Sequence, residues 1–164
     1  MTATVTVSLP RSIAERLYRE AQRLGLTIEE YLIELIVRGL DPSERAREYI
    51  KAARGLLEQA REELKRGDIR QAAEKLWGAT ALAVKAYAEW REGRRLASHR
   101  ELWEYKNVLE NDLGEWVHDA WMSGQGMHIC FYEGWCSVRD VEESIKRIEH
   151  LVAEIEKRIL QTEE

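Results

Sequence analysis

EKLWGATALAVKAYAEW (Glu74–Trp90) is apolar almost all the way round a helix, and many of its side chains are alanine or glycine. A helix without a polar face has to be surrounded by other elements, and small side chains let those elements approach closely. We therefore predict that this stretch is the centre of a helical bundle. The central helix is expected to run from about Ile69 to Trp90.

A preceding helix is predicted to pair with this central helix. Asp41 and Pro42 are typical of a helix start, and the apolar positions that follow lie on one face as far as Leu64. Gly67 then ends the helix and Asp68 caps the next one, which predicts a tight antiparallel hairpin.

Two further helices are expected after the central one. Ser98 with Glu101 forms a capping box for a helix that we expect to continue to about Met122. The stretch SGQGMHICFYEGWC (123–136) is rich in glycine and is predicted to be a loop. A last helix begins after Ser137, so the pattern predicts an all-α, up-down four-helix bundle.

The N-terminal residues have a different pattern. Apolar and hydroxyl side chains alternate from Thr2 to Leu9, which predicts a short strand, and Pro10 ends it. Two amphipathic helices follow, separated near Gly25 and ending at Gly39. We therefore divide the chain into residues 1–40 and residues 41–164.

The composition narrows the class of protein. The net charge is -5, which gives no global attraction for nucleic acid and leaves room only for a local basic patch. No apolar run reaches the length of a membrane span, and two cysteines are too few for a disulfide framework, so a cytoplasmic protein is expected. Arginine outnumbers lysine, a composition that favours a thermophilic source. His118, His128, Cys130 and Cys136 match no zinc pattern, and we expect no metal and no cofactor.

Three segments carry a resemblance to a known family: GDIRQAAEKLWGATALAVKAYA (Gly67–Ala88), SHRELW (Ser98–Trp103) and MHICFYEGW (Met127–Trp135). Through them residues 41–160 resemble the archaeal PaREP family, which belongs with the HEPN-type helical domains. The resemblance implies a bundle that dimerises. It also implies a toxin-like ribonuclease or a nucleotide-binding partner.

Active HEPN ribonucleases carry an arginine separated from a histidine by four to six intervening residues, near the start of the last helix. The corresponding histidine here is His128, but Trp121, Met122 and Ser123 occupy the places for arginine. The motif is incomplete, so we lean towards a protein that is not an enzyme.

Residues Thr2–Ile36 resemble ribbon-helix-helix proteins in their order of strand, helix, turn and helix. Such modules pair their strands across a dimer and place the ribbon in the major groove of DNA. The resemblance implies that Thr4, Thr6 and Ser8 face outward. Short hydroxyl side chains read bases weakly, so dimerisation is an alternative role for this segment.

The segment RRLASH (Arg94–His99) has the arginine–histidine spacing, although it lies between the second and third bundle helices. A phosphate held at a helix N-terminus, with His99 as proton carrier, is one interpretation. The alternative is a solvated link whose arginines pair with carboxylates. The basic residues concerned are Arg91, Arg94, Arg95 and Arg100.

The expected loop around His128 is a second candidate site. His128, Tyr132 and Glu133 offer a base, a stacking ring and a carboxylate in one turn. Gly124 and Gly126 would permit unusual backbone angles there. The alternative is a loop that folds its aromatic side chains over the end of the bundle.

Three hypotheses follow for function. The first is a non-catalytic or weakly catalytic HEPN-like module that binds nucleic acid or nucleotide and is related to toxin–antitoxin systems. The second is a metal-independent ribonuclease that uses Arg94 and His99, or His128. The third is an oligomeric interaction protein with no nucleic-acid role. In each case we expect a homo-oligomer, a dimer first, and no membrane. RNA, DNA or a nucleotide is the further partner under the first two hypotheses, and a protein is the partner under the third.

Overall fold

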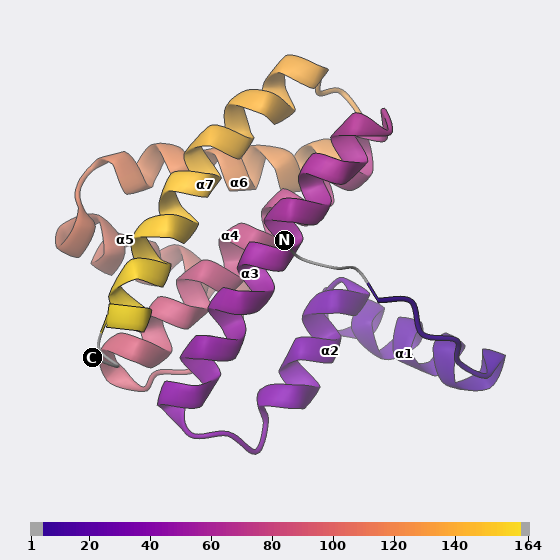
Figure 1. Cartoon of the computed structure of the whole chain (residues 1–164), viewed down its shortest axis with the longest axis horizontal. Helices are drawn as coiled ribbons and strands as arrows, with labels where there is room; N and C mark the ends of the chain where they lie inside the picture. The colour runs from indigo at the N-terminus through magenta and orange to yellow at the C-terminus, as the bar shows by residue number, and fades with distance from the viewer. Residues whose placement is uncertain (1–4, 162–164) are drawn as a thin grey trace. The chain divides into compact units, whose positions relative to one another are not determined.

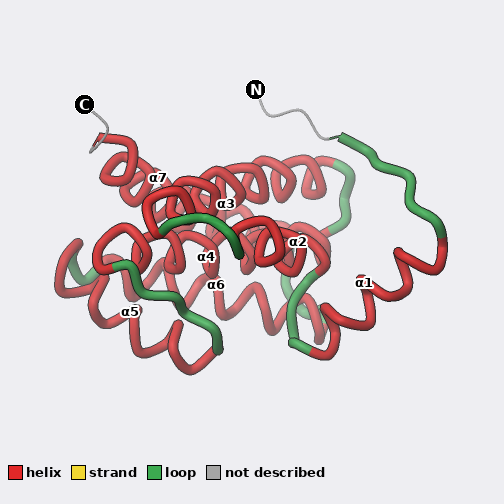
Figure 2. The backbone as a smooth tube through the Cα atoms, turned by 90° about the horizontal axis from the view of Figure 1, so that it is seen from below, coloured by secondary structure: helices red, strands yellow, loops and turns green. Residues whose placement is uncertain are grey.

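The computed structural model describes residues 5–161, and the chain divides into two compact units, Met1–Leu40 and Asp41–Glu164. All regular structure in the described residues is helical, so the all-α class is confirmed (Figures 1 and 2). The N-terminal unit holds α1 (Arg11–Arg23) and α2 (Ile28–Val37). The C-terminal unit holds α3 (Pro42–Lys65), α4 (Ile69–Glu92), α5 (His99–Leu113), α6 (Trp116–Glu133) and α7 (Val138–Gln161).

The central helix is confirmed as α4, which packs against α3, α5, α6 and α7. Every residue from Leu76 to Glu89 is buried, including the alanines that let the neighbouring helices approach. Two of its polar side chains are held inside the bundle: Thr80 donates a hydrogen bond to the Leu76 carbonyl at 2.8 Å, and Glu89 pairs with Arg45 of α3 at 2.9 Å. The small side chains of α4 allow the backbones of the surrounding helices to pack closely against it.

The predicted α3–α4 hairpin is also confirmed. Asp41 accepts a hydrogen bond from the Glu44 N–H while Glu44 bonds back, which is the full capping box at the start of α3. At the other end, Gly67 has a φ of 83°, and Asp68 accepts the Gln71 N–H to begin α4. The helices therefore turn where their own backbone groups find local partners.

The predicted end of the third helix and the predicted loop after it are wrong, although the helix does begin at the predicted Ser98–Glu101 capping box. The helix ends at Leu113, because Gly114 adopts a φ of 122° that favours glycine, and α6 then runs from Trp116 through Glu133. The C-terminal unit thus has five described helices where four were predicted, and most of the glycine-rich stretch is helical. Gly124 and Gly126 have ordinary helical angles; Gly134, with a φ of 71°, ends α6.

The predicted N-terminal strand is not present in the described residues. Val5 and Val7 are 79% and 71% exposed in an irregular segment, and Thr6 and Ser8 are exposed as well. A strand needs a neighbouring strand to take up its backbone hydrogen bonds, and the described part of one chain provides none. Thr4 lies outside the described residues.

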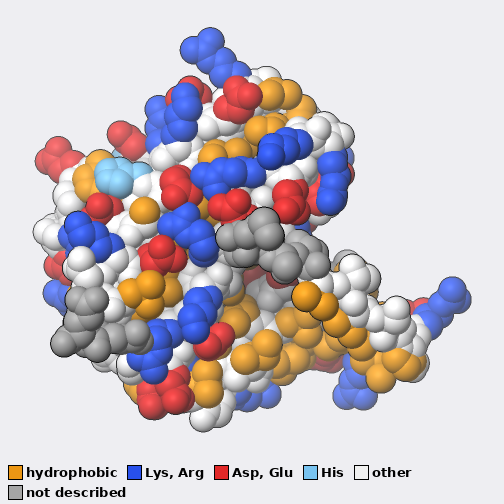
Figure 3. Space-filling view, in the orientation of Figure 1, with side chains coloured by type: hydrophobic (Ala, Val, Ile, Leu, Met, Phe, Trp, Pro, Cys, Tyr) orange, Lys and Arg blue, Asp and Glu red, His pale blue; other side chains and the backbone are white. Residues whose placement is uncertain are grey.

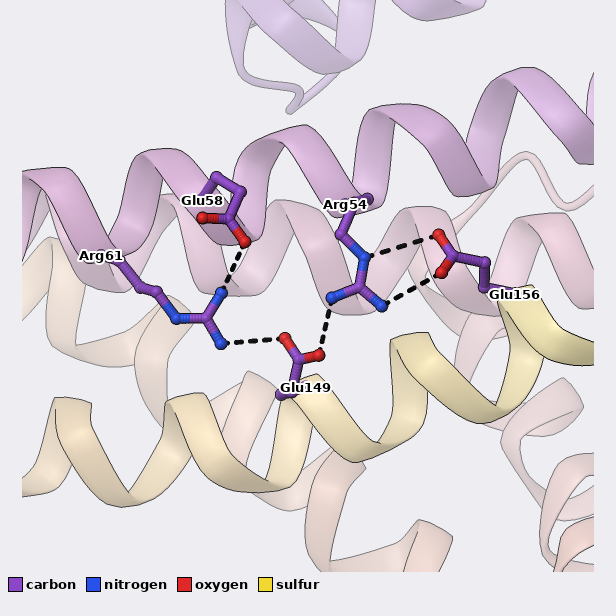
Figure 4. A network of polar contacts seen from close by, with 5 residues as sticks. All are labelled: Arg54, Glu58, Arg61, Glu149 and Glu156. Atoms are coloured by element: carbon purple, nitrogen blue, oxygen red, sulfur yellow. Dashed lines mark hydrogen bonds and ion pairs between the residues drawn. The ribbon is translucent and has the colours of Figure 1, made fainter. Parts of the chain in front are cut away.

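Two arginines of α3 tie that helix to α7 (Figure 4). Arg54 bonds to Glu149 at 2.7 Å and to Glu156 at 3.4 Å, and Arg61 bonds to Glu149 at 2.9 Å and to Glu58 at 2.8 Å. Elsewhere on the face seen in Figure 3, acidic and basic side chains are interspersed. Such a surface produces no large field of one sign.

Candidate functional site

His99 and His128, which the sequence offers as rival candidates, lie together against Trp77. The Trp77 ring is stacked on the His99 ring with 5.0 Å between centroids, and its centroid lies 4.9 Å from that of His128. The two imidazole centroids are 5.4 Å apart. We call Trp77, His99, His128 and Tyr132 the imidazole–indole cluster.

The antiparallel packing of α4 against α6 positions two of these rings. Gly124 lies against Thr80, His128 one turn further along α6 meets Trp77, and Tyr132 one turn beyond is edge-on to His128 at 5.3 Å. Residues four apart share one face of a helix, so the close approach at Gly124 directs the side chains that follow towards α4. The sequence could not show this, because it depends on α6 continuing past Ser123.

His99 is placed by the start of α5. Ser98 caps the helix and its partner Glu101 bonds back, which fixes His99 as the first helical residue. Its Nε2 lies 3.4 Å from the Nε2 atom of the Gln125 amide, which is buried in α6. Three helices therefore contribute one residue each to the contact between the histidines and the indole.

One side of the cluster is buried in the bundle, and the other side is exposed to solvent. Trp77 is buried, His128 is partly exposed, His99 is exposed, and Tyr132 is 65% exposed. Burial, and then the nearby His99, lower the pKa of His128, because both disfavour its charged form. The lowered pKa favours the neutral imidazole of His128, the form that can accept a proton. Behind it, Trp121 is fully buried, and its Nε1–H has no acceptor among the described residues.

The arginines around His99 face carboxylates or rings. Arg91 pairs with Asp112 and Glu92, and Arg100 pairs with Glu104 at 3.0 Å. The guanidinium of Arg94 lies 5.6 Å from the centroid of the Tyr105 ring and 4.0 Å from Glu92, and Arg95 is exposed.

At the start of α5, the Glu101 carboxylate accepts the Ala97 and Ser98 N–H groups. Part of the anion-binding capacity expected there is therefore already used by the chain itself.

Arg70 is a residue of this region that the sequence analysis missed. It lies two turns before Trp77 on α4, and it donates hydrogen bonds to the carbonyls of Phe131 and Tyr132 at 2.9 and 3.0 Å. The signal available was the spacing of seven between Arg70 and Trp77, which places both on one face of the helix.

Cys130 and Cys136 are joined by a disulfide, an outcome that the expectation of a reducing compartment did not include. The bond spans the end of α6, with Tyr132 and the 54% exposed Trp135 between the two cysteines. It therefore constrains the segment that carries the exposed ring of the cluster. Intracellular disulfides do occur in hyperthermophiles, so the bond does not by itself assign a compartment.

Fold and cluster together define an all-helical bundle protein with an aromatic, histidine-containing surface site. Residues 48–152 match the model of the archaeal PaREP1/PaREP8 family, and the chain belongs to this family. A crystal structure of a protein from Sulfolobus solfataricus has a similar fold, with a TM-score of 0.59 and 23% identity. That match covers 65% of this chain and 94% of the other. No curated protein matches the sequence.

Two negative findings apply to the described residues. They contain no group of three or more His, Cys, Asp or Glu side chains arranged to hold a metal ion. None of their helices is both long and apolar enough to cross a membrane.

Proposed function

We propose that this chain is an HEPN-like module that binds single-stranded RNA or a nucleotide at the imidazole–indole cluster. The observation that carries the proposal is the convergence of His99 and His128 on Trp77, with the exposed Tyr132 ring beside them. Two groups that donate and accept hydrogen bonds thus lie next to a surface for stacking. That combination suits a base and its sugar–phosphate.

Stacking supplies most of the expected affinity. A base stacked on an aromatic side chain contributes about 1–3 kcal/mol without requiring a particular sequence. The overall charge of -5 opposes the ligand, so few phosphates are expected to be contacted. Binding should therefore be of modest affinity and should depend only weakly on salt.

The test is the anisotropy of a labelled single-stranded RNA titrated with wild type, His99→Ala, Tyr132→Ala and His150→Ala. Tyr132→Ala and His99→Ala are expected to weaken binding about tenfold, which corresponds to one lost stacking or hydrogen-bonding partner. His150 is an exposed histidine on α7 that stacks on Trp116, away from the cluster, and is the matched control. Equal affinities for all four proteins would refute the proposed site.

The histidine pair also favours a second candidate function, metal-independent RNA cleavage. Neutral His128 would take the proton of a ribose 2′-hydroxyl, whose oxygen would then bond to the adjacent phosphorus. The bond from phosphorus to the 5′-oxygen would break, and protonated His99 would supply a proton to that leaving oxygen. The products are a 2′,3′-cyclic phosphate and a free 5′-hydroxyl.

The cleavage test uses labelled RNA with a chelator present and an excess of protein. Loss of cleavage in both His99→Ala and His128→Ala, with His150→Ala fully active, supports an acid–base pair. Cleavage that survives both substitutions would exclude His99 and His128 as its acid and base. An uncleaved substrate with wild type would leave binding alone as the function.

We further propose that the N-terminal unit mediates dimerisation. Among its described residues, five large apolar side chains are exposed, and such side chains can be covered by a second copy of the chain: Val5, Val7, Leu9, Ile13 and Ile36. The supporting resemblance to ribbon-helix-helix proteins extends the proposal to DNA binding through Thr4, Thr6 and Ser8, in a toxin–antitoxin context. If the unit serves only protein association, deletion of residues 1–40 should convert the dimer into a monomer and leave RNA and DNA binding unchanged.

A further inference from the structure

The guanidinium of Arg70 has two edges, and the protein uses one of them. Its Nε and one Nη2 hydrogen are directed to the carbonyls of Phe131 and Tyr132 at the end of α6. Its Nη1 makes no hydrogen bond or ion pair within the part of the chain that the structure describes. The edge formed by Nη1 and the second Nη2 hydrogen is a fixed pair of parallel donors, the geometry that matches two oxygens of a phosphate.

Several observations place this edge at the surface beside the cluster. Arg70 is exposed, and the side chain reaches the turn at Gly134, where a Cβ would lie 3.6 Å from three of its atoms. Its hydrogen-bond partner Tyr132 carries the exposed ring that lies against His128. Because Arg70 bonds to the backbone of Tyr132, its guanidinium and the exposed Tyr132 ring are close enough to contact neighbouring parts of one nucleotide.

No carboxylate forms an ion pair with Arg70 within the part of the chain that the structure describes. The Asp68 side chain accepts the Gln71 N–H at the start of α4, and Glu133 makes no ion pair with Arg70 among the described contacts. The two carbonyl bonds also hold the side chain in one conformation. Less conformational entropy is therefore lost when an anion binds than at a mobile surface arginine.

Resting on the proposed function, we infer that Arg70 is the phosphate-binding residue of the site and holds a phosphate of the nucleotide whose base stacks on Tyr132. The ligand chemistry is a phosphate oxyanion next to a planar base. It is supplied either by an RNA phosphodiester or by a free mononucleotide.

The experiment compares wild type, Arg70→Gln, Arg70→Lys and Arg147→Gln, using labelled oligouridylate over a range of salt. Arg70→Gln should lower the affinity at least tenfold at low salt and reduce the slope of log K against log salt by about 0.7, the value for one phosphate contact on a single strand. Arg70→Lys should retain the slope and lose affinity, because a point charge replaces the paired donors. Arg147, an exposed arginine on α7 paired with Glu143, should be neutral in the same assay.

Competition by adenosine and adenosine monophosphate distinguishes the two phosphate sources. If a mononucleotide is held, wild type should prefer the monophosphate several-fold, and Arg70→Gln should lose that preference. If only a phosphodiester is held, neither competitor displaces the RNA, while the change in salt slope persists.

The failures of the two proposals are distinct. Wild type that binds no RNA and no nucleotide overturns both. Wild type whose binding depends on His99 and Tyr132, with Arg70→Gln unchanged in affinity and slope, overturns only the role of Arg70. A purely structural arginine would lower the melting temperature and the affinity in Arg70→Gln with the slope intact, which also overturns it.

Discussion

Gly124 and Gly126 lie two residues apart in α6 and have opposite surroundings. A Cβ at Gly124 would lie 2.6 Å from Oγ1 and 2.7 Å from Cγ2 of Thr80, whereas a Cβ at Gly126 would have no heavy atom within 4 Å. Neither glycine has a positive φ. The same substitution to alanine is therefore expected to change stability in opposite directions at the two positions.

The magnitudes follow from two terms. Alanine in place of a helical glycine stabilises by about 1 kcal/mol, which is the whole expected effect of Gly126→Ala. At Gly124, the buried Thr80 is held by its hydrogen bond to the Leu76 carbonyl, so α4 and α6 must move apart. Overpacking of this kind costs up to about 3 kcal/mol, a net loss of about 2 kcal/mol. For a unit of about 120 residues, the melting temperature should fall by about 8 °C for Gly124→Ala and rise by about 4 °C for Gly126→Ala.

The assay is thermal unfolding of both variants followed by circular dichroism at 222 nm, with Gly124→Ala/Thr80→Ala as a third protein. Removing Oγ1 and Cγ2 of Thr80 should recover part of the loss caused by Gly124→Ala. Shifts of the same sign and size in the two glycine variants would refute the reasoning. They would mean that α6 does not cross α4 at Gly124 and that this stretch is a loop, as the sequence alone suggests.

Three further predictions concern polar and covalent links. Arg45→Met should lower the free energy of unfolding by about 3–5 kcal/mol in urea titrations, because the fully buried Glu89 carboxylate loses its partner, and Arg45→Met/Glu89→Leu should recover most of it; a single-variant loss below about 1 kcal/mol would contradict this. Burial raises the pKa of the Glu149 carboxyl, but its two arginine partners on α3 lower that pKa by more, so the net pKa lies below the ordinary value of 4.5. The ionised carboxylate therefore stabilises the folded state, and this contribution is lost as the pH falls through the pKa of the folded protein. The melting temperatures of wild type and Glu149→Gln should therefore differ at about pH 7 and converge at acidic pH, where Glu149 is protonated in the folded protein; a constant difference argues against the linkage. The free energy of unfolding of Cys130→Ser/Cys136→Ser should be about 2 kcal/mol lower than that of the oxidised protein, because the disulfide closes a short loop and restricts the unfolded chain. A reductant should lower the free energy of unfolding of wild type and leave that of the double variant unchanged.

The elements predicted well from the sequence are those specified by neighbouring residues. The limits of α3 and α4 follow from Asp41, Gly67 and Asp68, whose side chains or backbone angles act within one turn. The course of α6 was predicted wrongly, because a glycine can stand either in a loop or where two helices pack closely together, and the neighbouring sequence does not distinguish the two. The contact with Thr80, which is distant in the sequence, shows that Gly124 stands where two helices pack closely together.

Single residues of the candidate site were predicted from the sequence, but their arrangement in one cluster was not. His99 and His128 were chosen for their chemistry, but their meeting at Trp77 is a property of three packed helices. Trp77 itself was taken as part of the central helix. The spacing of seven places Arg70 on the same face of α4 as Trp77, but it does not reveal the hydrogen bonds of Arg70, because their acceptors are backbone carbonyls at the end of α6.

The disulfide at the end of α6 also makes the chain tolerant of a backbone cut. Between Cys130 and Cys136 lie four consecutive exposed residues, Tyr132 to Trp135, at the end of α6 and in the turn that follows it, where a protease can reach the backbone. The two fragments would remain covalently joined through sulfur, so α7 would stay attached to the bundle. A nicked molecule would migrate as one species without reductant and as two with it, and only the second gel would reveal the damage.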